Sequence, residues 1–224
     1  MMKLAEVFTQ LAYGELAQTV FGENDEGELV ENKYPALMAH VNLGLAALYK
    51  RFNLKEGRLT FPLSTAGNVY RLSVTDLHKI ERVLTDKGVD LPLNDGKEQY
   101  SCFTPRMDTI RVPLDIVNKV SSVPESYQTN SLEVWYRANH PMLVATGGDI
   151  NPDTIELELP YSHLEALLYF VASRVHNPIG MVNEFHSGNS WAARYEAECM
   201  KLQQQDLQID SSNDNDRLGR GGWV

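Results

Sequence analysis

The chain has few cysteines, the residues that build disulfide frameworks and many structural metal centres. Its two cysteines, Cys102 and Cys199, are far apart and stand in no metal-like spacing. We therefore expect two reduced, buried thiols, and nothing indicates an oxidising compartment. No run approaches the roughly 18 consecutive apolar residues that span a bilayer, and no apolar stretch of signal-peptide length opens the chain. The sequence thus predicts an aqueous, cytoplasmic setting.

Catalytic motifs are also lacking. The tempting group is His163, His176 and His186, with Glu165 and Glu184 nearby, but no His-Glu-x-x-His occurs. The first two histidines are too far apart to pair on one helical face. We expect satisfied surface or helix-end histidines, with His176 at a helix C-terminus. The sequence predicts no catalytic residue, no metal ligand and no cofactor, and therefore no enzyme.

Two other candidate sites fail on their spacing. The acidic run 210–216 would need Gly at the sixth and Glu at the twelfth position to form an EF-hand loop, and these positions hold Asn215 and Gly221. Its composition is typical of a solvated linker. The stretch 187–190 is no nucleophile elbow, because the spacing differs and no strand precedes it.

The charge of the chain disfavours sequence-specific DNA binding. The net charge is −10 and the pI is about 5.0, whereas DNA-reading proteins present a basic face. An acidic surface is compatible with a protein that DNA slides past. Trp135 and Tyr136 could stack bases from one strand. No Lys and Arg cluster surrounds them in sequence, which favours a core or subunit contact.

Hydrophobic periodicity predicts an α+β fold with helical ends and a β-rich middle. Helical spacing covers residues 3–21, with a possible break at Gly14, and residues 35–52, 160–176 and 191–202. Alternating patterns predict strands at 58–63, 70–74, 100–103, 109–112, 131–137 and 154–159. A short helix is predicted over 77–84, capped by Asp76 and ended by Gly88. The short strands suggest a small sandwich or barrel-like sheet.

Neither helical end has enough partners to form a core alone. We therefore expect one discontinuous helical bundle, 1–53 with 160–206, carrying a β-rich insertion at 54–159. Residues 207–224 are expected to form a flexible C-terminal arm, because the Ser/Asn/Asp run cannot bury enough apolar surface to offset its ordering entropy.

The tip of this arm carries the candidate binding residues, which are Arg217, Leu218, Arg220, Trp223 and Val224. A large aromatic residue at the end of a polar arm predicts a pocket in another subunit. The two arginines are expected to pair with acids on that partner.

The order of these parts resembles the head-to-tail adaptor proteins of short-tailed bacteriophages, the group that includes tubular tail protein A. The resemblance covers nearly the whole chain. It rests on the phrases Phe103-Thr-Pro105, Leu132-Glu-Val-Trp-Tyr-Arg-Ala-Asn139 and Leu159-Pro-Tyr-Ser-His-Leu-Glu165, on the Ala/Glu/Tyr-rich stretch 191–202, and on the polar arm.

The resemblance implies a virion structural protein of the neck or tail region, assembled in the host cytoplasm. In that family the adaptor forms a homo-oligomeric ring of twelve subunits that docks under the portal protein and extends the DNA channel. The ring provides the platform for a tail or nozzle protein. The resemblance also implies that the C-terminal arm reaches onto the portal, while genomic DNA passes without sequence recognition.

Two alternative functions stay open at this point. One is a neck or tail-completion protein of a long-tailed phage, which would also form rings. The other belongs to a different class, a small hydrolase that uses the histidines and acids near Glu165 and Glu184.

Overall fold

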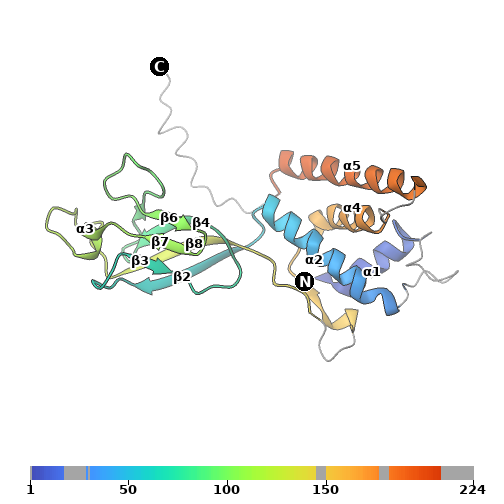
Figure 1. Ribbon diagram of the computed structural model, residues 1–224, viewed down its shortest axis with the longest axis horizontal. Coiled ribbons are helices and arrows are strands. Elements are labelled where there is room, and N and C mark those ends of the chain that lie inside the picture. The colour runs from blue at the N-terminus through green and yellow to red at the C-terminus, as the bar shows by residue number, and fades with distance from the viewer. Residues whose placement is uncertain (1, 18–28, 30, 145–149, 177–181, 208–224) are drawn as a thin grey trace, which may run out of the picture. The chain divides into compact units, whose positions relative to one another are not determined.

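The computed structural model describes residues 2–17, 29, 31–144, 150–176 and 182–207 (Figure 1). These residues form two compact units, each with its own hydrophobic core. The helical unit is drawn from Met1–Leu54 and His140–Gln208, and the β unit comprises Lys55–Asn139. Helices and antiparallel sheets are both present, so the α+β class is as predicted.

The helical unit is built around α4 (Leu164–Val175), which lies between α5 (Val182–Gln204) on one side and α1 (Leu4–Tyr13) and α2 (Tyr34–Arg51) on the other (Figure 1). Short 3-10 turns precede two of the helices, η1 (Glu31–Lys33) before α2 and η3 (Tyr161–His163) before α4. Helix α4 is buried on several sides, which explains its nearly continuous apolar sequence. Both predicted helical ends of the chain therefore contribute to one core.

Helix α2 follows its predicted boundaries. Pro35 lies in its first turn, where the missing N–H costs no hydrogen bond. Its buried stripe packs against α4, and Gly44 marks the closest approach, because a Cβ there would lie 2.6 Å from Leu167 Cδ1. Helix α1 ends where Gly14 was expected to break it.

The helical unit resumes at His140 rather than at the predicted residue 160. The reason is a set of contacts that the sequence pattern does not reveal. Asn42 of α2 exchanges two hydrogen bonds with the backbone of Leu143, at 2.9 and 3.0 Å. The predicted strand 154–159 is reduced to η2 (Pro152–Thr154) and β9 (Glu156–Leu157), and β9 pairs with β1 (Met2–Lys3) of the same unit.

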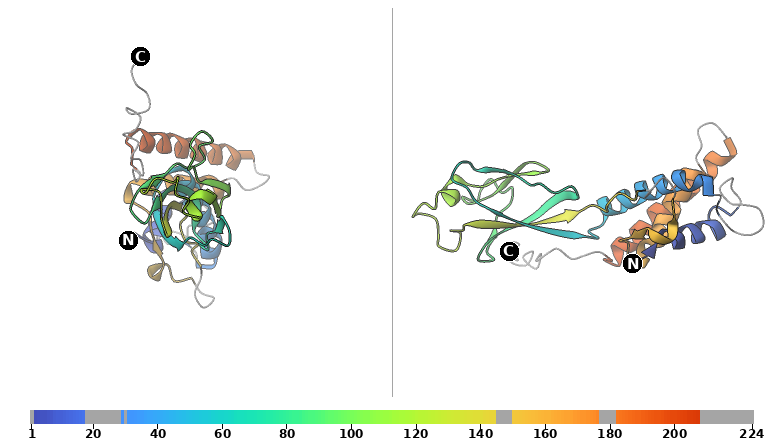
Figure 2. Two further views of the ribbon diagram at one scale, coloured as in Figure 1. Left: turned by 90° about the vertical axis from the view of Figure 1, so that its left-hand side faces the viewer. Right: turned by 90° about the horizontal axis from the view of Figure 1, so that it is seen from below.

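The β unit contains two antiparallel sheets that enclose its core (Figures 1 and 2). The four-stranded sheet has the order β2-β8-β4-β5 and the three-stranded sheet has the order β3-β7-β6. The strands are β2 (Glu56–Pro62), β3 (Val69–Arg71), β4 (Leu77–Thr85), β5 (Asp90–Leu91), β6 (Phe103–Arg106), β7 (Thr109–Arg111) and β8 (Ser131–Ala138), with the short helix α3 (Leu114–Val117) after β7. This arrangement is the small sandwich that the turn-punctuated pattern suggested.

The helix predicted over 77–84 is wrong, because this segment is the inner strand β4. Register shifts interrupt its pairing with β8 between Leu77 and Lys79 and again between Ile80 and Arg82. Each irregularity adds a residue to one strand, so apolar residues return to one face after three positions instead of two. The sequence of β4 therefore mimics a helical period. Asp76 caps no helix and instead accepts a hydrogen bond from Tyr136 Oη at 3.2 Å.

Gly57 of β2 gives a direct test of the packing in the β unit. It lies opposite Tyr136 of β8, whose ring covers it, and a Cβ at Gly57 would lie 2.2 Å from Tyr136 Cζ. We expect Gly57→Ala to lower the free energy of unfolding by about 1–3 kcal/mol, because the ring must move. Urea denaturation provides the measurement.

Gly67→Ala is the matched control, because a Cβ at Gly67 would meet nothing within 4 Å. This change should stay within about 0.5 kcal/mol of the parent protein. Equal effects of the two substitutions would show that the Tyr136 ring does not define the packing at Gly57.

Candidate interaction surfaces

The predicted portal-binding residues, Arg217, Leu218, Arg220, Trp223 and Val224, lie outside the described residues. The structure therefore leaves that assignment as a prediction. Candidate surfaces within the described residues come from side chains of the helical unit and of the β unit.

Two members of the predicted histidine group, His163 and His176, lie at opposite ends of α4. His163 is buried before α4, with its ring 4.8 Å from that of Phe52 and its Nδ1 3.0 Å from Ser162 Oγ. His176 follows the opposite end of α4, as expected for a helix C-terminus, and its Nε2 lies 2.9 Å from the Glu15 carbonyl oxygen. At 1.5 Å per residue, α4 separates them by roughly 20 Å.

No group of three or more His, Cys, Asp or Glu side chains suited to a metal ion occurs within the ranges that the structure describes. Glu184 and His186 belong to α5, and the structure does not describe their side chains. Both cysteines are free and buried, as predicted. Burial raises the pKa of the Cys102 thiol to about 12, which keeps it protonated at neutral pH.

A titratable cluster lies where α4 meets α5. The centroid of the Trp191 ring lies 5.6 Å from that of Tyr169 and 6.2 Å from that of His176. Arg194 Cζ lies 4.5 Å from the centroid of the Trp191 ring. Tyr169 Oη donates a hydrogen bond to Glu165. This bond and burial raise the pKa of Tyr169 to about 12, so the phenol stays protonated at neutral pH. The contacts fasten α5 to α4.

The outward face of the four-stranded sheet carries an arrangement that sequence reasoning missed. Arg58 Cζ lies 3.8 Å from the centroid of the Trp135 ring, and Arg82 Cζ lies 5.3 Å from the same centroid. Register places Arg58 on β2 and Arg82 on β4 directly opposite Trp135 of β8. The sequence separates these residues by dozens of positions, so no local cluster of Lys and Arg signals the contact.

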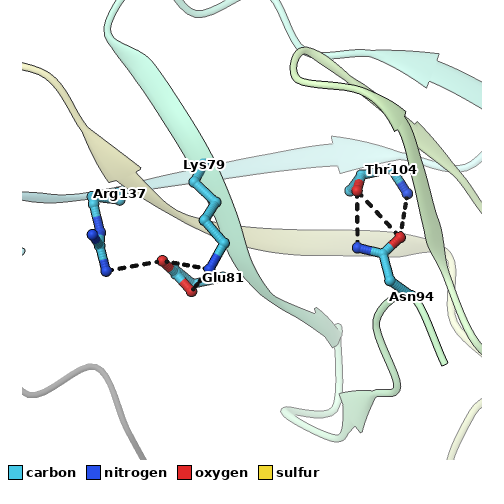
Figure 3. Close-up of polar contacts among 5 residues, drawn as sticks. All are labelled: Lys79, Glu81, Asn94, Thr104 and Arg137. Atoms are coloured by element: carbon cyan, nitrogen blue, oxygen red, sulfur yellow. Dashed lines mark hydrogen bonds and ion pairs between the residues drawn. The ribbon is translucent and has the colours of Figure 1, made fainter. Parts of the chain in front are cut away.

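Acidic side chains balance the basic ones on this face. Glu81 lies between Lys79 Nζ at 3.1 Å and Arg137 Nη2 at 3.3 Å (Figure 3). Asp90 pairs with Arg82 at 2.9 Å, and the Trp135 indole N–H donates to Glu133 at 2.7 Å. Tyr136, the next residue of β8, is buried, as a core contact requires. Because charges alternate, the face offers no continuous basic track for a phosphate backbone.

Two helices of the helical unit present uncharged outward faces. The exposed stripe of α2 contains Pro35, Ala36, Ala39, Leu43 and Ala46. Leu43 is 54% exposed, and α2 carries no charged residue before Lys50.

On α5 the exposed stripe contains Asn189, Ala193, Ala197 and Met200, and Met200 is 56% exposed. Helices that are apolar on their outward side as well as their inward side are usually covered by another element. The two stripes are therefore candidate subunit contacts.

Charge is divided unevenly between the units. The β unit, Lys55–Asn139, contains eleven basic and eleven acidic residues, so its formal charge is zero. The remainder of the chain has nine basic and nineteen acidic residues, which accounts for the whole net charge of −10.

A comparison with protein-family models and with curated proteins found no match for this chain. Among the helices of the described ranges, none has the length and apolarity that crossing a membrane would need.

The buried His163 predicts an acid-sensitive fold. Burial lowers its pKa below the usual value of about 6.5, and its Nε2 has no hydrogen-bond partner among the described residues. Its stabilising contribution is complete above the unfolded pKa of about 6.5 and is lost as the pH falls toward the folded pKa. We expect the Tm of His163→Leu to fall less than that of the parent between about pH 7.5 and about pH 5.

His40 acts in the same direction, because burial and the nearby Arg174 lower its pKa. The variant should therefore keep part of the acid sensitivity. The Tm is measured by circular dichroism across the pH range. Parallel Tm curves for parent and variant would contradict the role of His163.

Proposed function

We propose that this protein is a head-to-tail adaptor of a short-tailed bacteriophage, a virion structural component rather than an enzyme. It would form a ring beneath the portal protein, extend the DNA channel and present a platform to a tail or nozzle protein. We also propose that its architecture is a discontinuous helical bundle that carries a β-rich insertion and is followed by a flexible C-terminal arm. The resemblance in sequence phrases and in the order of parts motivates it.

The observation that carries the proposal is the pair of uncharged outward stripes on α2 and α5. A closed ring uses heterologous contacts, in which one face of a subunit complements a different face of its neighbour. One helical unit here offers two different uncharged faces. We propose that the α2 stripe of one subunit packs against the α5 stripe of the next, in a ring of twelve by analogy with the family.

The division of charge supports a role in the DNA channel. The negative charge lies in the residues outside the β unit, which include both segments of the helical unit. An acidic wall repels the phosphate backbone and lets DNA pass without being held. We propose that the helical unit faces the channel and that DNA is not read in sequence.

Electron microscopy of the purified chain mixed with portal protein tests the assignment. Closed rings stacked on portals would support the adaptor. Rings that bind completed long tails instead would favour the neck or tail-completion protein. Turnover in a hydrolase substrate panel by a protein that remains monomeric with portal would overturn the proposal.

The α2 stripe can be tested by Leu43→Glu. A carboxylate at this exposed position should leave the subunit folded and place an unpaired charge in the helix contact. We expect at least a tenfold loss of rings at a fixed concentration, on the order of 1.4 kcal/mol or more per contact. Image counts and analytical ultracentrifugation give the measurement.

Tyr13→Glu is the matched control, because Tyr13 is an exposed apolar residue, 70% accessible, on α1. It should form rings as the parent does. Normal rings from Leu43→Glu would remove the α2 stripe from the subunit contact.

The arm is tested by deleting residues 207–224. We propose that Arg217, Leu218, Arg220, Trp223 and Val224 bind the portal, with the Trp side chain contributing on the order of 2–4 kcal/mol per arm. The truncated protein should stay folded and dissociate from portals in sedimentation. Retention equal to that of the full chain would show that the arm is not the anchor.

A further inference from the structure

The three-stranded sheet of the β unit presents an outward face with exposed apolar residues. Register aligns Val69 of β3, Arg111 of β7 and Phe103 of β6 in one row across the sheet. Val69 is 52% exposed and Phe103 is 39% exposed. Met107, in the turn between β6 and β7, is 68% exposed. Directly opposed residues share a face, so Val69, Arg111 and Phe103 form one surface, and Met107 lies in the adjoining turn.

Arginines stand among these apolar side chains. The next row of the sheet holds Arg71 of β3 and Arg106 of β6 on either side of Thr109. Arg71 pairs with Asp108 at 2.8 Å, while neither Arg106 nor Arg111 has an acidic partner among the described residues. We call the set Val69, Arg71, Phe103, Arg106, Met107 and Arg111 the arginine face.

The arginine face rests on a fixed support. The Asn94 side chain donates to Thr104 Oγ1 and accepts from the Thr104 backbone N–H, both at 2.9 Å, which holds β6 (Figure 3). Beneath the face, Ile110 and Cys102 are fully buried. Arginine, Met and aromatic residues on a rigid exposed surface are the composition enriched at protein interfaces.

A complementary surface lies on the helical unit. Tyr161 is 64% exposed, and its Oη donates to Glu6 at 2.7 Å. Glu156 lies on β9, opposite Lys3 of β1, and η2 with Asp153 packs beside β1 and α1. Asp153 and Glu156 are exposed and form no ion pair within the described parts of the chain. We call Glu6, Asp153, Glu156 and Tyr161 the acidic face.

We propose that the arginine face of one copy docks onto the acidic face of a second copy. Charge complementarity selects this occupant: the arginine face has three basic residues, of which only Arg71 is paired with an acid, Asp108, and the chain's acidic excess lies outside the β unit. The exposed Val69, Phe103 and Met107 suit an apolar partner such as Tyr161 better than a phosphate backbone. Two different faces make the contact heterologous, so it repeats from copy to copy.

This inference rests on the proposed ring, to which it adds a second contact beside the helix stripes. The test therefore uses the full chain in a Leu43→Glu background, which removes the proposed helix contact. One variant carries Arg106→Glu and Arg111→Glu, and the other carries Asp153→Lys and Glu156→Lys. Sedimentation velocity at low and high salt measures self-association.

The background protein should self-associate at low salt and dissociate as salt rises, because the contact is electrostatic. Each double variant alone should self-associate at least about tenfold more weakly. An equimolar mixture of the two should regain a dimer, because one partner keeps its acidic face and the other keeps its arginine face. An isologous contact, in which the arginine face of one copy meets the arginine face of the other, would give no such recovery.

Arg58→Glu is the matched control, because it reverses the same charge on the opposite outward face of the sandwich. It should associate as the background does, with circular dichroism confirming that every variant is folded. Unchanged self-association of the Arg106/Arg111 variant, or no recovery in the mixture, would overturn the inference. So would a loss of duplex DNA binding, measured by fluorescence anisotropy, as the only effect of that variant.

Ring imaging without the Leu43→Glu background separates the two proposals. Rings formed by the parent and equally by the Arg106/Arg111 variant would leave the adaptor function standing and remove this contact. A parent that forms no rings with portal would remove the adaptor function, while the mixing experiment would still decide the contact.

Discussion

The burial of α4 is the interaction on which the rest of the structure depends. Leu167 and Phe170 of α4 approach Gly44 of α2 so closely that a methyl group would not fit between them. α5 covers another side, through Trp191 on Tyr169 and Tyr195 on Phe170. Because helices from both ends of the chain bury the same central helix, the polypeptide must leave the helical unit and return to it.

That constraint explains why the β unit can carry its own composition. It departs after Leu54 and returns at His140 with a separate apolar core, so its surface need not match that of the helices. Its charges balance, and two ion pairs join neighbouring strands, Glu81 of β4 with Arg137 of β8 and Arg82 of β4 with Asp90 of β5. The acidic excess is left to the rest of the chain, where the proposed channel function would use it.

Subunit assembly is the role that we propose for the exposed faces of both units. No match to a known family supports or opposes the adaptor assignment. The proposal therefore depends on exposed faces whose chemistry suits a second protein surface. The α2 and α5 stripes lack charge, whereas the arginine face and the acidic face carry opposite charge, so the two contacts would respond differently to salt.

The sequence by itself determined the α+β class, the positions of α2, α4 and β8, and the burial of both cysteines, because strong local periodicity and end signals specify these elements. The helix that the apolar pattern predicted for β4 is wrong, because two β-bulges give this strand a three-residue period. Only the tertiary structure placed residues 140–159 with the helices and brought Arg58 and Arg82 onto Trp135. Cross-strand and long-range packing join residues that sequence separates, so no local pattern could have shown these contacts.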